Sequence, residues 1–230
     1  MERKCAAAGI SVEFFKAFDG SKGEHVALSR YDDAMAFWLT GHRLTPGELG
    51  CFASHYTLWL SCVELRQPLL ILEDDIDFSP RISEAIAVLE ALVPRYQMIR
   101  LAGTRAREHR VLEKVGAWEI VRFNKGPYGT TAYAISPAAA AMLLAKANTW
   151  WLTVDRYVDR FWSHGVQSVG ILPYPVMHGS PADTEIEPHR FHAKHSFAVG
   201  LRREGWRLVE DGRRLAANWA YKLGRQSALQ

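Results

Sequence analysis

Short apolar runs alternate with helical patterns along most of this chain, and the alternation restricts its fold more than any other feature. The clearest helix is expected over residues 44–65, where Thr45 suits the N-cap, Pro46 suits the first helical position and Glu48 completes a capping box. An apolar strand that begins at Leu69 follows after a short turn. Strands that alternate with helices usually form a mostly parallel sheet covered on both faces. The sequence therefore predicts an α/β, Rossmann-like fold with a mostly parallel sheet flanked by helices.

The expected elements cover most of the first 172 residues. Strand patterns occupy residues 12–18, 69–73, 97–102, 117–123, 130–136 and 167–172. Further helical patterns occupy the first ten residues, residues 79 or 80 to about 92, the segment from Pro137 onwards, and residues 153–164. We interpret residues 1–200 as one domain. Residues 201–230, in which basic and aromatic residues are interleaved, are interpreted as a basic helical tail.

The composition excludes several classes of protein. A chain of 230 residues, 48% of them hydrophobic, can bury a sizeable core. Its net charge of +3 is too small to indicate a nucleic-acid partner. The cysteines, Cys5, Cys51 and Cys62, lack metal-ligand spacing and indicate free thiols in a reducing compartment. Since the sequence shows no signal peptide and no run of about 18 apolar residues, we expect a cytoplasmic protein.

Three consecutive acids, Glu73, Asp74 and Asp75, end the apolar strand at 69–72. Adjacent carboxylates repel one another, and the end of a buried strand is a costly place for them. A divalent cation would neutralise them and could also bind the phosphates of a substrate at the carboxyl end of the sheet, where α/β proteins bind ligands. The alternative is a solvent-exposed turn before the next helix. The residues alone leave both interpretations open.

Five segments of the chain resemble glycosyltransferase family 25, which includes bacterial lipooligosaccharide galactosyltransferases and collagen galactosyltransferases. They are GISVEFFKAFDG (9–20), LTPGELGCFASHYTLW (44–59), LLILEDD (69–75), GTTAYAISPAAAAMLL (129–144) and TVDRYVDRFW (153–162). They occur in the family's order and cover roughly residues 3–180.

The resemblance implies a GT-A fold and an inverting transfer of a hexose, typically galactose from UDP-galactose, to a sugar hydroxyl. Glu73, Asp74 and Asp75 become the family's variant of the DxD element, with Asp75 as a ligand of Mn²⁺ or Mg²⁺ and the other two in contact with the donor. Asp155 becomes the candidate catalytic base, with Glu48 as a second candidate. The remaining candidates are His178 as a metal ligand and Ser54, His55, Gly129, Thr130 and Thr131 as donor contacts.

Simpler structural roles are also open for these residues. Asp155 could be a helix-start charge that the helix dipole favours, and Glu48 is accounted for by the capping box. Ser54 and His55 could form a packed, hydrogen-bonded pair, and residues 129–131 a plain turn before a strand.

The neighbouring residues have structural expectations of their own. We expect Trp150 and Trp151 in the core rather than stacked on an acceptor sugar. Asp159 is expected as a surface partner of Arg156 or Arg160.

The resemblance also suggests the partners, a UDP-sugar donor and a lipid-linked oligosaccharide acceptor. The tail would then be an amphipathic segment that lies on an anionic inner-membrane surface, and the protein would be peripheral there. The alternative is an ordinary helix packed on the domain.

One departure from the family bears on function. Relatives begin with a further apolar strand that helps to hold the uracil, and this chain starts at Met1 without it. We therefore keep a non-catalytic or weakly active sugar-nucleotide-binding protein as an alternative. A haloacid-type phosphohydrolase, suggested by the D-x-D pattern at residues 75–77, is a more distant one.

Overall fold

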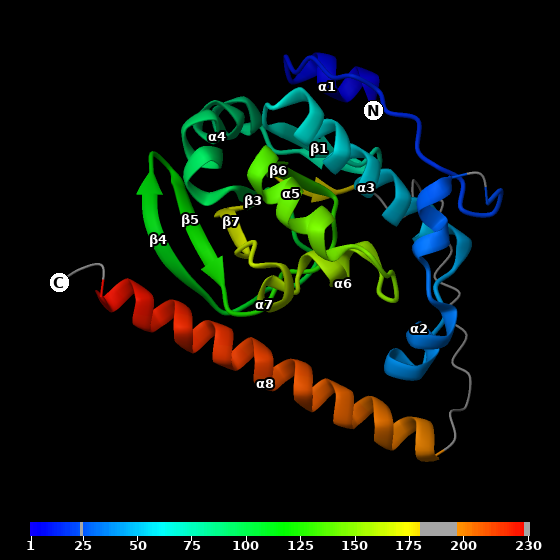
Figure 1. Ribbon diagram of the computed structural model, residues 1–230. Coiled ribbons are helices and arrows are strands. Elements are labelled where there is room, and N and C mark those ends of the chain that lie inside the picture. Colours follow the sequence, from blue (N-terminus) through cyan, green and yellow to red (C-terminus); the bar gives the residue numbers. More distant parts are fainter. Residues whose placement is uncertain (24, 180–196, 228–230) are drawn as a thin grey trace.

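The computed structural model describes residues 1–23, 25–179 and 197–227. Its centre is a six-stranded sheet with the strand order β1-β6-β3-β7-β5-β4, and helices lie against it (Figure 1). The strands are β1 (Leu69–Leu72), β3 (Met98–Arg100), β4 (His109–Val115), β5 (Trp118–Phe123), β6 (Ala132–Ile135) and β7 (Val169–Leu172). A separate two-stranded sheet pairs β2 (Ile76–Phe78) with β8 (Val176–His178). The prediction of an α/β fold is confirmed.

The central sheet is mixed, so the prediction of a mostly parallel sheet is wrong. β3 and β7 pair in parallel, whereas the other neighbouring pairs in this sheet are antiparallel. A parallel neighbour needs a crossover connection of about a dozen residues or more. Residues 109–135 contain no such crossover: β4 and β5 form a hairpin through Gly116 (φ +59°), and β6 returns between β1 and β3. β1, β3 and β7 still point the same way, which places their carboxyl ends at one edge of the sheet.

The segment 12–18 is irregular, although its sequence predicted a strand. It crosses the start of α3 (Pro46–Leu65), where the Phe18 N–H donates to Ser54 Oγ at 3.0 Å. The two backbones lie so close that a Cβ added at Gly50 would stand 2.2 Å from the Phe18 carbonyl oxygen. Contact with a helix, rather than a sheet partner, therefore fixes this segment.

Most expected helices are present, with shifted ends. α3 has the predicted capping box between Thr45 and Glu48. The pattern at 153–164 forms two short helices, α6 (Val154–Val158) and α7 (Phe161–His164), and the expected helix near residue 80 is α4 (Ile82–Tyr96). The others are α1 (Glu2–Ala7), the 3₁₀ helix η1 (Val26–Arg30), α2 (Asp33–Thr40) and α5 (Pro137–Lys146). The sequence patterns did not predict η1, α2, β2, β4 or β8.

Hydrophobic packing forms a layer on each face of the sheet. Phe52 and Trp59 of α3 pack with Trp150 and Leu143 on one face, and Leu89 of α4 packs on the other. Trp150 is buried and its ring stacks on Phe52 with 4.3 Å between the centroids, as the core interpretation predicted. Each large side chain removed from water in this way contributes about 1.5–3 kcal/mol to folding.

The C-terminal helix α8 (Phe197–Ser227) runs along the side of the domain (Figure 1). Glu210 accepts hydrogen bonds from Arg160 and from the Trp162 indole, and Asn218 bonds Arg122 and the Asn124 carbonyl. The part of α8 that contains Glu210 and Asn218 is therefore packed on the domain. In the described part of the chain, no helix combines the length and the apolar character that crossing a bilayer requires.

Candidate active site

Several of the predicted site residues meet where β1 ends and β6 begins. Because the two strands are antiparallel, Glu73 emerges beside Thr130 and Thr131, and the Glu73 N–H donates to the Thr131 carbonyl at 2.8 Å. The Thr130 hydroxyl donates to Glu73 Oε1 at 2.7 Å. The order of strands thus brings together two motifs that lie more than fifty residues apart in the sequence.

A chain of hydrogen bonds orients His55 toward Glu73. Tyr133, on β6, accepts a bond from the Trp59 indole at 2.9 Å, so its own proton is directed to His55 Nδ1 at 2.8 Å. The Nε2–H of His55 then faces Glu73 Oε1 at 3.5 Å. Burial by itself would raise the pKa of Glu73, but the bonds from His55 and Thr130 hold that pKa below its usual value. Glu73 is therefore a buried, oriented carboxylate.

Asp75 is the acid whose surroundings fit a metal ion. Its Oδ1 atom is buried and has no hydrogen-bond partner among the residues that the structure describes. Burial, followed by the negative charge of Glu73, raises the pKa of Asp75, whereas His178 lowers it. A buried carboxylate oxygen without a partner is costly, and a cation would satisfy it.

The small sheet brings His178 to Asp75. β2 and β8 pair with Ile76 opposite His178, and the Gly179 N–H donates to the Asp75 carbonyl at 2.7 Å. The His178 ring lies 3.2 Å from the Thr131 hydroxyl, measured at Nε2. A carboxylate oxygen and an imidazole nitrogen suit Mn²⁺, so Asp75 and His178 are the residues that could hold the cation. Asp74 is exposed, and Asp77 pairs instead with Lys4 at 2.8 Å.

Gly129 permits the close approach that this corner of the site requires. Its φ is +80°, a conformation that side chains with a Cβ rarely adopt. An added Cβ would lie 3.1 Å from Thr104 and 3.8 Å from His178 Nε2. The glycine therefore keeps the edge of the candidate metal position open.

Cys51 connects the acid motif to Asp155, and the sequence patterns gave it no role. Burial, then the charges of Glu73 and Asp155, raise the pKa of its thiol to about 12. Its sulfur, a His55 nitrogen and a Glu73 oxygen lie within 4.8 Å of one another. The thiol is therefore protonated and lies close to Glu73, and the charge of Asp155 also acts on it. The only sequence signal was its position inside the quoted segment at 44–59.

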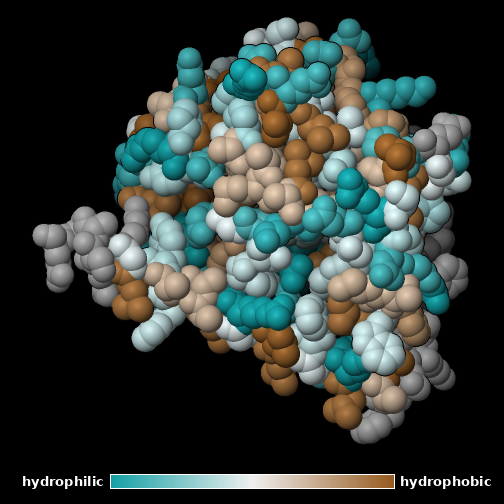
Figure 2. Space-filling view, in the orientation of Figure 1, coloured by the Kyte–Doolittle hydropathy of each residue, from teal (hydrophilic) through white to brown (hydrophobic). Residues whose placement is uncertain are grey.

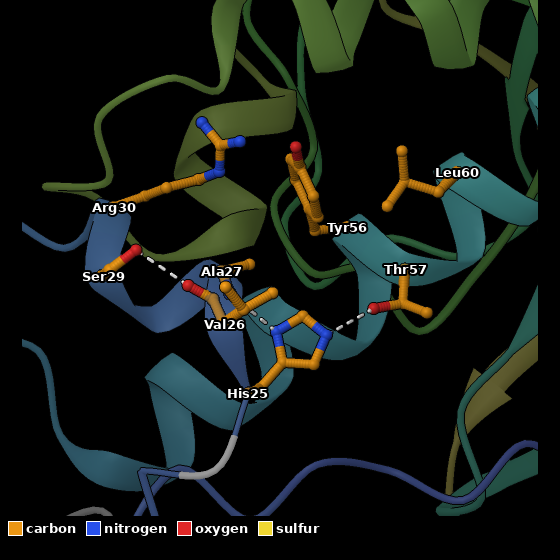
Figure 3. Close-up of a pocket in the computed structure, with 8 residues that line it drawn as sticks. All are labelled: His25, Val26, Ala27, Ser29, Arg30, Tyr56, Thr57 and Leu60. Carbon is orange, nitrogen blue, oxygen red and sulfur yellow. Dashed lines mark hydrogen bonds between the residues drawn. The ribbon is translucent and has the colours of Figure 1, made fainter.

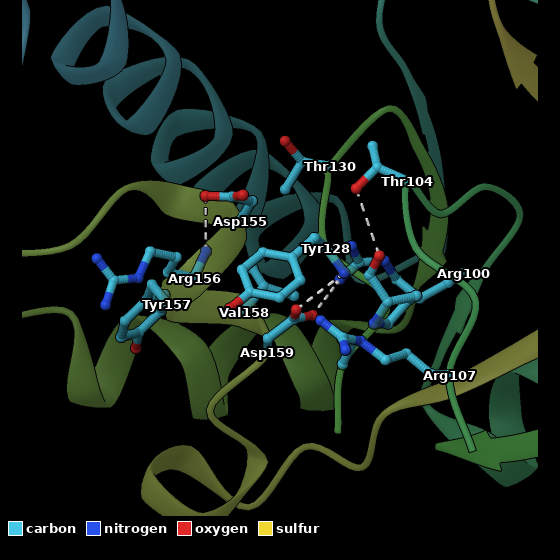
Figure 4. Close-up of polar contacts among 12 residues, drawn as sticks. Arg100, Thr104, Arg107, Tyr128, Thr130, Asp155, Arg156, Tyr157, Val158 and Asp159 are labelled. Carbon is cyan, nitrogen blue, oxygen red and sulfur yellow. Dashed lines mark hydrogen bonds and ion pairs between the residues drawn. The ribbon is translucent and has the colours of Figure 1, made fainter. Parts of the chain in front are cut away.

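Asp155 begins α6 at the edge of a large cleft. Its Oδ1 accepts bonds from the Thr153 hydroxyl and from the Arg156 N–H, the latter at 2.7 Å (Figure 4). The cleft has a volume of about 950 Å³, and its lining includes Asp155, Glu48 and Gly129. The two predicted acid–base candidates therefore face a common space, although Glu48 is also occupied in its capping box.

The expectation that Asp159 is a surface partner of Arg156 or Arg160 is wrong. Asp159 is 6% exposed, and its oxygens accept bonds from Arg100 at 3.3 Å and from the Tyr128 N–H at 3.0 Å (Figure 4). Burial raises the pKa of Asp159 to about 6. Arg100 comes from β3, a contact that spacing along the helix could not reveal. The Arg100–Asp159 pair fixes the turn before Gly129 and so supports the residues of the candidate site.

Ser54 has two partners inside the protein. Its hydroxyl accepts from the Phe18 N–H and donates to the Gly50 carbonyl at 2.8 Å. Ser54 is therefore buried and hydrogen-bonded, but to Phe18 and Gly50, whereas His55 bonds Tyr133. The role of Ser54 as a donor contact stays a prediction.

A second hollow, of about 470 Å³, lies between η1 and α3 (Figure 3). His25 lies beside it and bonds the Thr57 hydroxyl at 3.1 Å. None of the predicted site residues line this hollow, so the 950 Å³ cleft remains the candidate substrate space.

The comparisons with known proteins agree on one family. Residues 1–158 match the family model described as glycosyltransferase family 25 (LPS biosynthesis protein). A glycosyltransferase 25 family member of Drosophila pseudoobscura pseudoobscura is 34% identical over 156 residues, 63% of this chain and 24% of the relative. The Drosophila melanogaster relative of the same name is 33% identical over 156 residues, 63% of this chain and 25% of the relative.

Some relatives carry names that deny activity. A probable inactive glycosyltransferase 25 family member 3 of Bos taurus is 32% identical over 113 residues, 46% of this chain and 19% of the relative. The chain spans only about a quarter of the length of the insect relatives that it matches.

Proposed function

The chain belongs to glycosyltransferase family 25, and from this premise we propose that it transfers a hexose, galactose from UDP-galactose, to a hydroxyl of a lipopolysaccharide-type acceptor with inversion. The observation that supports this most is the buried Oδ1 of Asp75, which lies beside His178 after the end of β1 and has no partner within residues 1–23, 25–179 and 197–227. A GT-A transferase needs a group of this kind where the donor diphosphate would lie.

In this proposal Asp75 and His178 hold Mn²⁺ or Mg²⁺. When bound, the cation supplies positive charge that stabilises the UDP leaving group. Glu73, kept ionised by His55 and Thr130, orients the donor sugar or ribose. Thr131 and Gly129 shape the space beside the diphosphate, and Ser54 supports the helix that carries His55.

Asp155 is proposed as the base that accepts the proton of the acceptor hydroxyl. The acceptor oxygen must lose its proton as the new bond forms, and a carboxylate that lines the cleft could take it. Asp155 Oδ1 is already held by Thr153 and Arg156, which fixes the orientation of the carboxylate. Glu48 is the second candidate because it lines the same cleft.

A donor screen tests this function. The protein is incubated with UDP-galactose, UDP-glucose and UDP-N-acetylglucosamine, each with Mn²⁺, with Mg²⁺ and with EDTA, and UDP release and donor affinity are measured. We expect release from UDP-galactose that EDTA abolishes. Absence of release from every donor, with or without added acceptor, would reject the proposal.

A specific observation favours a second candidate, a non-catalytic sugar-nucleotide-binding protein: several relatives are named inactive. Micromolar binding of UDP-galactose without UDP release, in the same screen, would support it. The haloacid-type phosphohydrolase has no such support, because Asp77 pairs with Lys4.

We also propose that the protein works in the cytoplasm, peripherally on an anionic membrane that carries a lipid-linked acceptor. α8 is fixed to the domain, yet it leaves Leu201, Leu208, Leu215 and Trp219 between 63% and 68% exposed. These residues recur at intervals of seven and four, so they lie on one face of the helix. Figure 2 shows hydrophobic side chains at intervals along the lower edge of the molecule, where α8 lies. Such a face, with basic residues beside it, suits the interface of an anionic bilayer.

Vesicle binding tests the membrane proposal. The double variant Leu208→Ser/Trp219→Ser should bind phosphatidylglycerol vesicles at least tenfold more weakly. Each substitution removes an apolar side chain that the membrane interface would bury. Leu60→Ser, an exposed leucine on α3, is the matched control. A concentration-dependent dimer that the double variant abolishes, with vesicle binding unchanged, would assign the face to a second copy instead.

A further inference from the structure

The cleft beside Asp155 extends well beyond the predicted donor motif. Glu48, Gly129 and Asp155 line one part of it, whereas Glu73, Asp74 and Asp75 do not belong to its lining. Its other wall is the inner face of α8, which contributes Trp206 and Arg214 among others. Because the donor motif lies outside the cleft and the proposed base lies in it, the cleft is the space left for the acceptor.

Several cations that line the cleft already pair with carboxylates. Arg160 pairs with Glu210 at 2.6 Å, and Arg207 with Glu204 at 3.0 Å. Arg214 pairs with Asp211 at 2.7 Å.

Arg105 and Lys125 are different. Neither forms an ion pair with a carboxylate in the described part of the chain, although both line the cleft. The cleft therefore retains positive charge in one region.

These cations are held close together. Arg105 and Arg107 both lie over the Tyr128 ring, at 4.9 and 5.2 Å from its centroid, and Arg107 also donates to the Gly126 carbonyl. Lys125 follows β5 and is half-buried. Burial, then the charge of Arg214, lowers the pKa of Lys125, and Arg107 and Arg105 act in the same direction. Arg105 and Arg107 therefore act on Lys125 together with the Arg214–Asp211 ion pair, and an anion would relieve the repulsion among the cations.

We propose that Arg105 and Lys125 bind an anionic group, a phosphate or a carboxylate, carried by the sugar acceptor. That the bound molecule is a sugar acceptor rests on the proposed function. The Arg105 guanidinium, positioned by Tyr128, offers paired N–H donors that match a phosphate or carboxylate, and Lys125 adds a charge that is partly removed from water. Recognition of this kind would select charged over neutral acceptors and place their hydroxyl toward Asp155.

Binding of small anionic sugars tests the subsite. Glucose 6-phosphate, glucuronate and methyl glucoside are titrated into the full-length protein by calorimetry, with and without saturating UDP and Mn²⁺. We expect at least one of the two anions to bind at least tenfold more tightly than the neutral sugar. The tighter of the two identifies the group as phosphate or carboxylate.

Matched variants locate the subsite. Lys125→Gln should weaken binding of the anionic sugar about tenfold, the usual scale for one charge-assisted contact. Lys146→Gln, which removes an exposed lysine from the end of α5, should change it less than twofold. UDP affinity should be the same in both variants.

Two results would overturn the inference. One is equal affinity for the neutral and anionic sugars. The other is a parallel loss of UDP affinity in Lys125→Gln, which would give these cations to the donor diphosphate. Failure of the proposed function looks different: the donor screen would show no UDP release while the anionic sugar still bound in a Lys125-dependent way.

Discussion

At the scale of single residues, the sharpest question concerns Asp155. Asp155→Asn keeps the shape of the side chain and its bond from the Arg156 N–H but cannot accept a proton. Transfer should fall about 100-fold or more, the usual effect of losing a general base, with UDP-galactose affinity within a few-fold of wild type. Steady-state transfer rates and donor titrations measure the two quantities. Equal losses of affinity and transfer would make Asp155 a donor contact, and unchanged transfer would leave it as a helix-start residue and direct attention to Glu48.

The family resemblance predicted several residues of the candidate site but not the residues that hold them in place. Glu73, Thr130, Thr131 and His178 were each predicted, and the structure brings them to one corner. Asp159 was misinterpreted, because its partner Arg100 lies on a strand 59 residues away. A single arginine in a strand segment gives no sign, in one sequence, that it is buried and pairs with a distant acid. The pairing of Arg100 with Asp159 becomes visible only in the folded structure.

At the scale of elements, the sequence predicted local order better than strand pairing. The capping box of α3 and the helix that opens at Ser136 and Pro137 depend on neighbouring residues, and both are confirmed. Strand direction depends on connections that an apolar run does not encode, so the sheet was expected to be mostly parallel, whereas β6 is antiparallel to both of its neighbours. Segment 12–18 failed for a related reason, since Phe18 packs against a helix while Phe14 and Phe15 are exposed.

His164 joins the two short helices α6 and α7 and gives them a pH dependence. Its Nε2 lies 3.2 Å from the Tyr157 and Val158 carbonyls, and its Nδ1 accepts from the Val166 N–H. Burial lowers the pKa of His164 to about 4. Because its folded-state pKa lies below the unfolded one of about 6.5, the unfolded chain alone takes up a proton as the pH falls between these values. Its contribution to stability is therefore full above about pH 6.5 and is lost toward pH 4.

Urea unfolding of wild type and His164→Gln at pH 7 and pH 5 measures this effect. The variant should be less stable at pH 7, and the gap should shrink by about 1.4 kcal/mol per pH unit below 6.5. The raised pKa of Asp159, about 6, has the opposite sign in this window, and it cancels in the comparison because both proteins carry it. A gap that stays constant with pH would show that His164 is not buried neutral.

At the scale of the whole molecule, α8 is part of the domain rather than a loose tail. Glu210 and Arg160 are only 13% and 12% exposed, and Glu210 also accepts from Trp162. Glu210→Ala would leave the Arg160 charge and the indole N–H without this acceptor, so the free energy of unfolding should fall by about 2–4 kcal/mol.

A matched acid on the same helix serves as its control. Glu204 pairs with Arg207 near the surface, where its side chain is 56% exposed, so Glu204→Ala should change stability by less than about 1 kcal/mol. Urea unfolding of both variants decides the point. Equal, small effects would mean that α8 docks only weakly through this contact.

The function proposed for the whole molecule depends on Asp75 acting as a metal ligand. Mn²⁺ binding and Mn²⁺-dependent release of UDP from UDP-galactose are measured in wild type, Asp75→Asn and Asp77→Asn, which each remove one negative charge from the same segment. Asp75→Asn should lower turnover at least ~100-fold and weaken Mn²⁺ binding, because it removes the negative charge of a carboxylate whose buried Oδ1 has no other partner in the described part of the chain. Asp77→Asn should stay within about threefold of wild type, since Asp77 pairs with Lys4 at the surface. Near-normal turnover in Asp75→Asn, or equal losses in both variants, would contradict the assignment of the metal to Asp75.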